Sequence, residues 1–258
     1  MTQKTDFNDL SNRDFVLATD LDGTFLGGSE RDRETLYSWI EENRDTIGLV
    51  FVTGRDPQFI AELCDGGVPW PEYVVGDVGT TIAGVGMSRK IEPIETLETE
   101  IATTWGDSGT RVREALNGHP GLTLQQTAFR YRVSYDLNPA EFDDRALEIV
   151  RDMGFDPLIS DNRYFDVLPR GISKGPSIQR LVDHLGVARE RTLVAGDTMN
   201  DFSMLACGLP AVAVGGAEEA LRRALEGHDH VYHAEALGAG GILEAIDALN
   251  LHRTPGGN

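Results

Sequence analysis

The sequence of 258 residues predicts an α/β protein with a doubly wound parallel sheet and an inserted α+β module. Short apolar runs alternate with amphipathic stretches near both ends of the chain, a pattern typical of parallel strands covered by helices. Polar and glycine-rich residues follow each apolar run, where the ligand site of such a sheet lies. In the middle of the chain, apolar and polar residues alternate instead, as they do in half-exposed antiparallel strands.

The N-terminal part of the chain contains three expected strands separated by two expected helices. The elements are, in order, a strand at 15–18, a helix on which Leu36, Trp39 and Ile40 share one face, a strand at 49–52, a helix at 56–63 and a strand at 73–75. This alternation implies a parallel sheet with helices on both faces.

The rhythm changes after about residue 84. The expected elements are then an amphipathic stretch at 94–116, strands at 122–125 and 131–137, a helix at 139–153, and strands at 156–159 and 164–168. Strands on one side with helices on the other suggest a separate module. We therefore predict a core domain of residues 1–83 and 170–258 and an inserted cap domain of residues 84–169, which could hinge at residues 84–86 and 169–171.

The parallel pattern returns at the C-terminal end of the chain. The expected elements are a helix that begins at Lys174 and stops at Gly186, strands at 192–195 and 210–214, a helix at 217–225, an edge strand at 230–232 and a closing helix at 242–249.

Composition limits the partners of the protein. A formal net charge of -19 makes nucleic acid and anionic membrane surfaces poor partners, and no apolar stretch approaches a membrane span. The polar residues 1–13 do not resemble a secretory signal, and the two isolated cysteines, Cys64 and Cys207, suggest a reducing cytoplasm. We expect a cytoplasmic monomer or small homo-oligomer that acts on a small molecule.

The first expected strand ends in Asp20-Leu21-Asp22-Gly23-Thr24. Side chains alternate along an extended segment, so Asp20 and Asp22 point the same way. Two converging carboxylates repel each other unless a cation lies between them, and hard oxygen ligands suit Mg²⁺. By itself, the motif is equally consistent with an acidic turn that follows a strand.

Four polar signatures occur in the predicted core domain. They are Asp20-Leu21-Asp22-Gly23-Thr24, Thr53-Gly54-Arg55, Lys174-Gly175 and Gly196-Asp197-Thr198-Met199-Asn200-Asp201. In this order, with a large insert before the lysine, they resemble the four motifs of the haloacid dehalogenase-like phosphatases. Taken singly, Lys174 could be a solvated residue at a helix start, and Thr53, Asp197 and Asp201 could be helix caps. Their joint occurrence favours an enzyme.

The resemblance implies four catalytic residues. Asp20 would attack the phosphorus and form an aspartyl-phosphate, and Asp22 would act as general acid and then as general base. Thr53 would donate a hydrogen bond to a phosphoryl oxygen. Lys174 would neutralise the transferring group, which a compact ammonium does better than a planar guanidinium in a narrow space.

The resemblance also implies Mg²⁺ as the cofactor. Asp20, the backbone carbonyl of Asp22 and Asp197 would hold the ion, with Asp201 as a further ligand or as a residue that supports the ligands. Asn200 would orient Lys174 or the waters on the metal.

Parts of the chain resemble one subgroup, the sugar phosphatases, which includes sucrose-phosphate and mannosylfructose-phosphate phosphatases. The similar stretches are Arg130-Tyr131-Arg132-Val133-Ser134-Tyr135, Tyr164-Phe165-Asp166-Val167-Leu168-Pro169-Arg170-Gly171 and Gly76-Asp77-Val78-Gly79-Thr80-Thr81. The resemblance implies that Arg132 faces the active site, although its alternation with Tyr131 equally allows an exposed position. The expected substrate-binding residues are Thr53, Gly54, Arg55, Arg132, Lys174 and Asn200.

The sequence therefore predicts a magnesium-dependent phosphatase for a small phosphorylated metabolite, with a sugar phosphate such as a sucrose-phosphate-like disaccharide phosphate as the substrate. Two alternatives remain. One is a phosphomutase that passes the phosphoryl group to a second hydroxyl of a hexose phosphate. The other is a catalytically silent regulatory module of the same fold.

Overall fold

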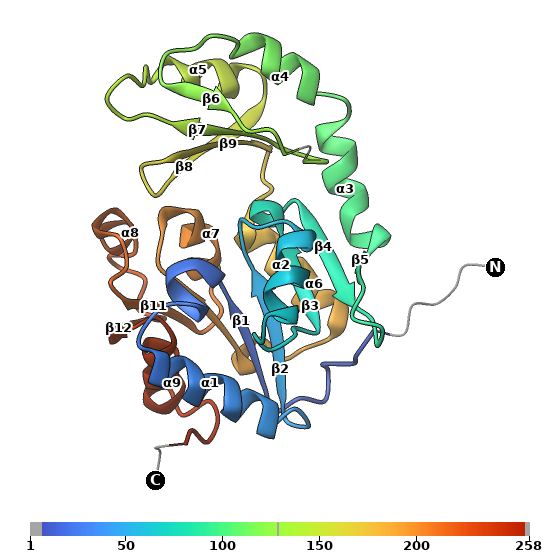
Figure 1. Ribbon diagram of the computed structural model, residues 1–258, viewed down its shortest axis with the longest axis vertical. Coiled ribbons are helices and arrows are strands. Elements are labelled where there is room, and N and C mark those ends of the chain that lie inside the picture. The colour runs from blue at the N-terminus through green and yellow to red at the C-terminus, as the bar shows by residue number, and fades with distance from the viewer. Residues whose placement is uncertain (1–6, 128, 256–258) are drawn as a thin grey trace, which may run out of the picture.

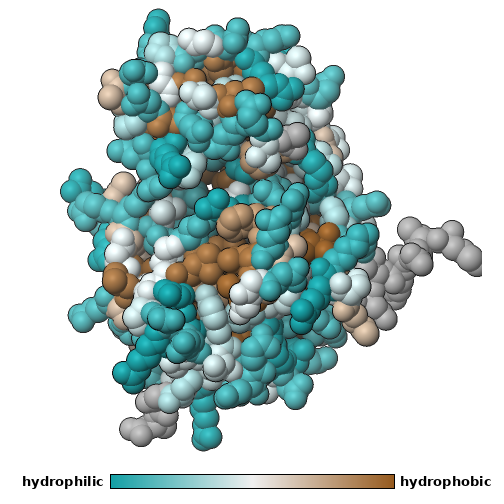
Figure 2. Space-filling view, viewed as in Figure 1, coloured by the Kyte–Doolittle hydropathy of each residue, from teal (hydrophilic) through white to brown (hydrophobic). Residues whose placement is uncertain are grey.

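The computed structural model describes residues 7–127 and 129–255, which form two domains (Figure 1). The core domain is built on an eight-stranded sheet, and the cap domain above it is built on a four-stranded sheet. Hydrophilic side chains cover much of the face in view, and a waist separates the two lobes (Figure 2). Within the described ranges, no helix combines the length and the apolar character that a membrane span requires.

The core sheet has the strand order β12-β11-β10-β1-β2-β3-β4-β5. The strands from β12 to β3 run parallel, whereas β4 and β5 add an antiparallel edge. Their bounds are β1 (Phe15–Thr19), β2 (Ile47–Val52), β3 (Tyr73–Gly76), β4 (Thr81–Val85), β5 (Ile91–Pro93), β10 (Thr192–Gly196), β11 (Ala211–Gly215) and β12 (Val231–Leu237).

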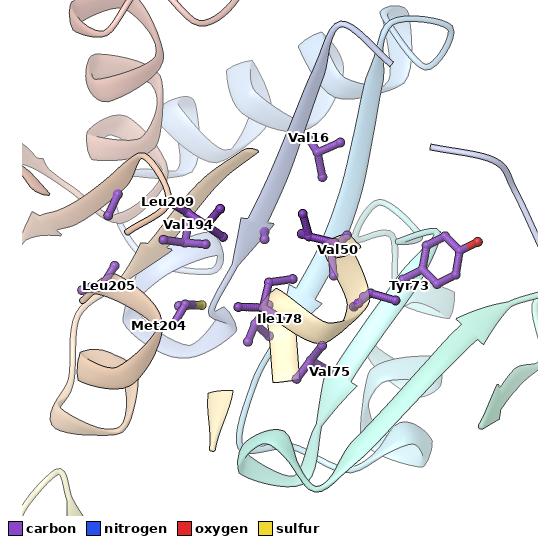
Figure 3. Packing of buried hydrophobic residues seen from close by; sticks show 14 of the residues in the cluster. Val16, Val50, Tyr73, Val75, Ile178, Val194, Met204, Leu205 and Leu209 are labelled. Atoms are coloured by element: carbon purple, nitrogen blue, oxygen red, sulfur yellow. The ribbon is translucent and has the colours of Figure 1, made fainter. Parts of the chain in front are cut away.

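Helices cover both faces of the core sheet, as the alternating side chains of β1 require. Val16 and Ala18 belong to a buried cluster with α6 (Lys174–Leu185), α7 (Phe202–Leu205) and α8 (Glu219–Ala224), and Figure 3 shows part of this packing around Ile178. Phe15 and Leu17 belong to the opposite cluster, with α1 (Glu30–Glu42), α2 (Pro57–Asp65) and α9 (Gly238–Ala248). This is the predicted doubly wound arrangement.

The cap domain is an antiparallel sheet with helices on its outer face (Figure 1). Its strand order is β6-β7-β9-β8, and its core contains Trp105, Tyr135 and Phe165. The bounds are α3 (Glu95–Trp105), α4 (Gly109–Ala115), β6 (Leu122–Leu124), β7 (Val133–Leu137), α5 (Arg145–Asp152), β8 (Phe155–Ser160) and β9 (Tyr164–Pro169). The tip of the β8–β9 hairpin points toward the core domain (Figure 1).

The core sheet extends further along the chain than the sequence predicted. Residues 84–93 were expected in the cap, but β4 pairs with β3 and β5 pairs with β4. The hinge expected at residues 84–86 lies in this hairpin, where the backbone N–H of Gly86 donates to the Lys90 carbonyl. Alternation of apolar and polar residues does not reveal which sheet an antiparallel strand joins. We propose that the insert begins at α3.

Several element borders also differ from the prediction. The stretch at 94–116 forms two helices because Gly106 adopts a positive φ of 58° just after α3. The closing helix begins at Gly238 rather than at residue 242, and its glycine-rich first turn carries little apolar periodicity to reveal it.

Candidate active site

The candidate site lies at the carboxyl ends of β1, β2 and β10. Asp20 follows β1, and the chain then turns sharply through a short helical turn, Leu21–Phe25. Gly23 has a φ of 79° in this turn, and a Cβ there would overlap the carboxylate of Asp197, which follows β10. Glycine at this position therefore lets the first and fourth motifs lie in direct contact.

Lys174 lies at the centre of the site, at the start of α6, and its side chain is fully buried. Its Nζ donates hydrogen bonds to Asp20 Oδ1 at 2.6 Å, Asp201 Oδ1 at 2.7 Å and Asn200 Oδ1 at 2.8 Å. Burial lowers the pKa of Lys174, but the facing carboxylates outweigh it and raise this pKa above its ordinary value. The lysine therefore stays charged.

The carboxylates of this cluster carry more negative charge than one ammonium neutralises. Burial raises the pKa of Asp20 well above its usual range, against the opposing effect of Lys174. One oxygen from each of Asp20, Asp197 and Asp201 lies within 4.8 Å of the others, a spacing that suits one divalent cation. The donor set thus fits Mg²⁺.

The hydrogen bonds distinguish the three carboxylates. Asp201 Oδ2 accepts from the backbone N–H groups of Asp197 and Thr198, and its other oxygen accepts from Lys174. Asp197 Oδ1 accepts a hydrogen bond from the Thr24 hydroxyl at 2.7 Å, and Asp20 Oδ1 accepts one from Lys174. Within the described residues, the second oxygen of each of these two carboxylates has no hydrogen-bond donor. Asp20 and Asp197 are therefore the better placed metal ligands, and Asp201 supports the loop that carries Asp197.

Acidic pH is expected to weaken Mg²⁺ binding at this cluster. Burial and the neighbouring Asp201 raise the pKa of Asp197 from 3.8 to about 7, so a proton competes with the metal near pH 6. The apparent Mg²⁺ affinity, measured by calorimetry, should fall about tenfold from pH 8 to pH 6. An affinity that stays constant over this range would contradict the prediction.

The same shift gives the metal-free protein a pH-dependent stability. Protonation of Asp197 stabilises the folded state fully below its ordinary pKa of 3.8, and this stabilisation disappears as the pH rises through about 7. In denaturant titrations, added Mg²⁺ should therefore stabilise the protein more at pH 8 than at pH 6. The Asp197→Asn variant should show a smaller difference.

The second motif follows β2. Thr53 is buried, and its Oγ1 accepts a hydrogen bond from the backbone N–H of Arg55 at 3.2 Å. The Arg55 guanidinium donates to both oxygens of Asp22, at 2.8 and 3.0 Å. The Asp22 carboxylate thus points into the space between the domains, whereas Asp20 is buried.

Arg132 also reaches this region, from the cap. It is 6% exposed, and it donates to Asp166 Oδ1 and to the Gly54 carbonyl, both at 2.9 Å. The alternative of an exposed, solvated Arg132 is therefore wrong. Its partners Asp166 and Asp77 belong to the stretches that resemble the sugar phosphatases, but they were not predicted as site residues, because only the folded chain brings them together.

A cavity of about 620 Å³ lies between the two domains. The core side includes Asp20, Asp22, Gly54, Arg55, Asp197 and Asn200. The cap side includes Gln125, Thr127, Phe129, Arg132, Asp136, Ser160, Arg163 and Tyr164. Except for Thr53 and Lys174, which lie buried beneath it, and Asp201, all the predicted site residues line this cavity. Its cap wall offers hydrogen-bonding groups, which suits a polyhydroxylated ligand.

The position of Lys174 depends on the glycine that follows it. A Cβ at Gly175 would overlap the backbone carbonyl of Ser203, because α6 and α7 approach closely there. We expect Gly175→Ala to lower the free energy of unfolding by about 1–3 kcal/mol, as overpacking does. Gly86→Ala is a control, because the nearest atom to a Cβ there, the Lys90 carbonyl oxygen, lies at an ordinary contact distance of 3.9 Å. Equal denaturation midpoints for the two variants would contradict this account.

The sequence of the chain is similar to those of several known proteins. The model of the sucrose-6F-phosphate phosphohydrolase family matches residues 13–250. A glucosylglycerol-phosphate synthase of Pseudomonas anguilliseptica is 40% identical over 234 residues, which cover 90% of this chain but only 30% of that protein. A mannosylfructose-phosphate phosphatase of Agrobacterium fabrum is 27% identical over 90% of this chain and 95% of its own length.

The solved structures show the same fold. The sucrose-phosphatase of Synechocystis sp., in complex with sucrose and phosphate, superposes with a TM-score of 0.81 at 25% identity. It covers 92% of this chain, and the match spans 98% of that chain. The sequence motifs, the family match over nearly the whole chain and the fold lead to one conclusion. The chain belongs to the sucrose-6F-phosphate phosphohydrolase family, within the haloacid dehalogenase-like phosphoric monoester hydrolases.

Proposed function

We propose that this protein is a magnesium-dependent phosphatase that hydrolyses a phosphorylated glycoside through an aspartyl-phosphate on Asp20. The observation that carries the proposal is the buried Asp20–Lys174 pair at 2.6 Å, next to a polar cavity between the core and the cap. This arrangement provides a nucleophile, a fixed positive charge and room for a sugar.

In the first half of the proposed reaction, the Asp20 carboxylate attacks the phosphorus and the bond to the sugar oxygen breaks. Asp22 gives its proton to the departing oxygen. The Thr53 hydroxyl donates a hydrogen bond to a phosphoryl oxygen. The three N–H groups of Lys174 already donate to Asp20, Asn200 and Asp201, so its buried positive charge stabilises the growing negative charge through space. Mg²⁺, held by Asp20, Asp197 and the carbonyl of Asp22, would neutralise further charge on the phosphoryl group.

In the second half, Asp22 takes a proton from a water molecule that attacks the phosphorus. The bond between Asp20 and phosphorus breaks, and inorganic phosphate leaves. Arg55 holds both oxygens of Asp22 in the absence of substrate, so one of these hydrogen bonds must open before Asp22 can serve the leaving oxygen. We propose that the incoming phosphate dianion competes for the Arg55 guanidinium and so releases Asp22.

The names of the relatives support a phosphorylated glycoside as the proposed substrate. Two of them are named for sucrose phosphate and mannosylfructose phosphate, and a third is named for the synthesis of glucosylglycerol phosphate. Each of these compounds contains a glycosyl group and a phosphate. We propose that the cap wall binds this uncharged glycosyl part, while the core binds the phosphate.

A phosphate-release assay with Mg²⁺ tests the proposal. The panel contains sucrose phosphate, mannosylfructose phosphate, glucosylglycerol phosphate and hexose 1-phosphates, with Asp20→Asn as the inactive control. We expect at least one glycoside phosphate to exceed every hexose phosphate in kcat/KM. Isomerised hexose phosphate without free phosphate would support the phosphomutase instead. No release from any substrate, together with unchanged properties of Asp20→Asn, would support a silent module.

We further propose that the protein acts in the cytoplasm, as a monomer or a small homo-oligomer. Both cysteines, Cys64 and Cys207, are free thiols in the structure, which suits a reducing compartment. Size-exclusion chromatography with light scattering measures the oligomeric state directly.

A further inference from the structure

We propose that Arg132 is a positioning residue that completes the phosphate site when the cap is docked. In this account the arginine does not bind the sugar. It holds the Gly54 carbonyl, and the peptide group that contains this carbonyl orients the hydroxyl of Thr53. The inference rests on the proposed function, because it assigns to Thr53 the role of phosphate donor.

The cap fixes the Arg132 guanidinium on one side. Its Nη1 donates to Asp166 Oδ1 at 2.9 Å, and the same oxygen accepts from the Ser134 hydroxyl. The ring of Phe129 lies 3.7 Å from the guanidinium carbon, measured to the ring centroid. An arginine held by a buried carboxylate and an aromatic face has little freedom to follow a substrate.

The other side of the guanidinium contacts the core at the second motif. Its Nη2 donates to the Gly54 carbonyl at 2.9 Å. This carbonyl and the N–H of Arg55 belong to one planar peptide group, so fixing the first fixes the second. The N–H of Arg55 donates to Thr53 Oγ1 at 3.2 Å. The Thr53 oxygen is thereby an acceptor on that side, and its own proton is free to point to a phosphoryl oxygen.

A buried carboxylate of the core keeps Arg132 at this interface. Asp77 Oδ1 lies 3.7 Å from Arg132 Nη2 and has no hydrogen-bond partner among the described residues, while Asp77 Oδ2 accepts from the Thr81 hydroxyl. The backbone N–H of Asp77 donates to the Arg55 carbonyl, so the loop after β3 and the second motif are joined directly. Asp77 and Asp166 together offset the charge of Arg132, which leaves little of it for a ligand.

Arg130 offers a matched control, because it also bridges the cap and the core. It donates to both oxygens of Glu98 on α3 and to the Thr81 hydroxyl. It makes no described hydrogen bond to the second motif, and it does not line the cavity. Loss of Arg130 should therefore remove one contact between the cap and the core while the hydrogen bond from Arg132 to the Gly54 carbonyl stays in place.

The experiment compares Arg132→Met, Arg132→Lys, Arg130→Met, Thr53→Val and the double variant Arg132→Met/Thr53→Val. Two substrates are used with Mg²⁺: the best glycoside phosphate from the panel, and p-nitrophenyl phosphate, whose leaving group has no glycosyl part. We expect Arg132→Met to reduce kcat/KM about 100-fold for both substrates, as a small misplacement of a catalytic group does. The lysine variant reaches only one of the two acceptors and should lose about tenfold.

The double variant should be no slower than Thr53→Val, because both changes remove the same phosphate contact. Arg130→Met should stay within about threefold of the wild type in kcat/KM, whatever it costs in thermal stability. A loss with Arg132→Met that is confined to the glycoside phosphate would assign the residue to sugar binding and overturn the inference. Multiplicative losses in the double variant, or an equal loss with Arg130→Met, would also overturn it.

Calorimetric binding of orthovanadate with Mg²⁺ tests the same step without turnover. Arg132→Met and Thr53→Val should weaken this binding to the same extent, and Arg130→Met should not. Failure of the proposed function and failure of the role assigned to Arg132 give different results. Absence of phosphate release by the wild type would overturn the proposed function, whereas normal vanadate binding by folded Arg132→Met would overturn the role of Arg132.

Discussion

Asp20→Asn is expected to reduce phosphate release by about 10⁴-fold or more, because it removes the proposed nucleophile of the first half-reaction, and without an aspartyl-phosphate the second half-reaction has no substrate. Asparagine has the shape of aspartate, so the hydrogen bond that Lys174 donates to Asp20 Oδ1 can persist to the amide oxygen. The loss should therefore appear in kcat and not in the fold. Phosphate release and thermal denaturation of the same preparation measure the two effects.

A second readout identifies the nucleophile directly. Acid quenching of the wild type during turnover should trap a phosphoryl adduct, and peptide mass spectrometry should locate it on Asp20. Asp183→Asn is the control, because this exposed aspartate pairs with Arg189 on the surface far from the cavity. An adduct on another residue, or an Asp20→Asn variant that keeps full activity, would contradict the assignment of Asp20 as the nucleophile.

Lys174→Met is expected to damage both the activity and the stability of the protein. The side chain is fully buried between Asp20 and Asp201, and methionine leaves two buried carboxylates without their counter-charge. Breaking a buried ion pair in this way lowers the free energy of unfolding by about 3–5 kcal/mol. Loss of the positive charge at the transferring phosphoryl group should reduce kcat by about 10²–10³-fold.

Denaturant titrations and phosphate release check this prediction. Lys90→Met is the control, because Lys90 forms an exposed ion pair with Glu92 and its loss should change neither quantity. Lys174→Arg should also fail to restore activity, since a planar guanidinium cannot reach Asp20, Asn200 and Asp201 from one buried point. Wild-type turnover by the arginine variant would show that charge alone suffices at this position.

The core of the site could be predicted from the sequence because each motif is local. A buried strand followed by Asp20, or by Thr53, is readable in a short window, and parallel strands bring their carboxyl ends to one edge of the sheet. The three motifs that follow core strands were therefore expected to converge. Lys174 instead begins α6, and the structure brings it within hydrogen-bond distance of Asp20 and Asp201. The alternating burial of β1, with Val16 and Phe15 on opposite faces, follows from the same short-range logic.

The edge of the core sheet could not be predicted in the same way. The sequence of the β4–β5 hairpin is compatible with a place in either domain. Only the pairing of β4 with β3 assigns the hairpin to the core. The break between α3 and α4 was easier to predict, because Gly106 lies between them in the sequence. The periodicity of the flanking residues obscured that signal.

The sequence by itself determined the fold class, and it predicted the proposed nucleophile, the lysine and the acidic cluster, each carried by residues next to a strand or helix end. Tertiary structure decided which groups the two arginines serve. Arg55 meets Asp22 across 33 residues, and Arg132 meets Asp166 and Gly54 across 34 and 78 residues. The sequence gives the charge of an arginine but not its partner, because the pairing depends on how the chain packs within and between the two domains.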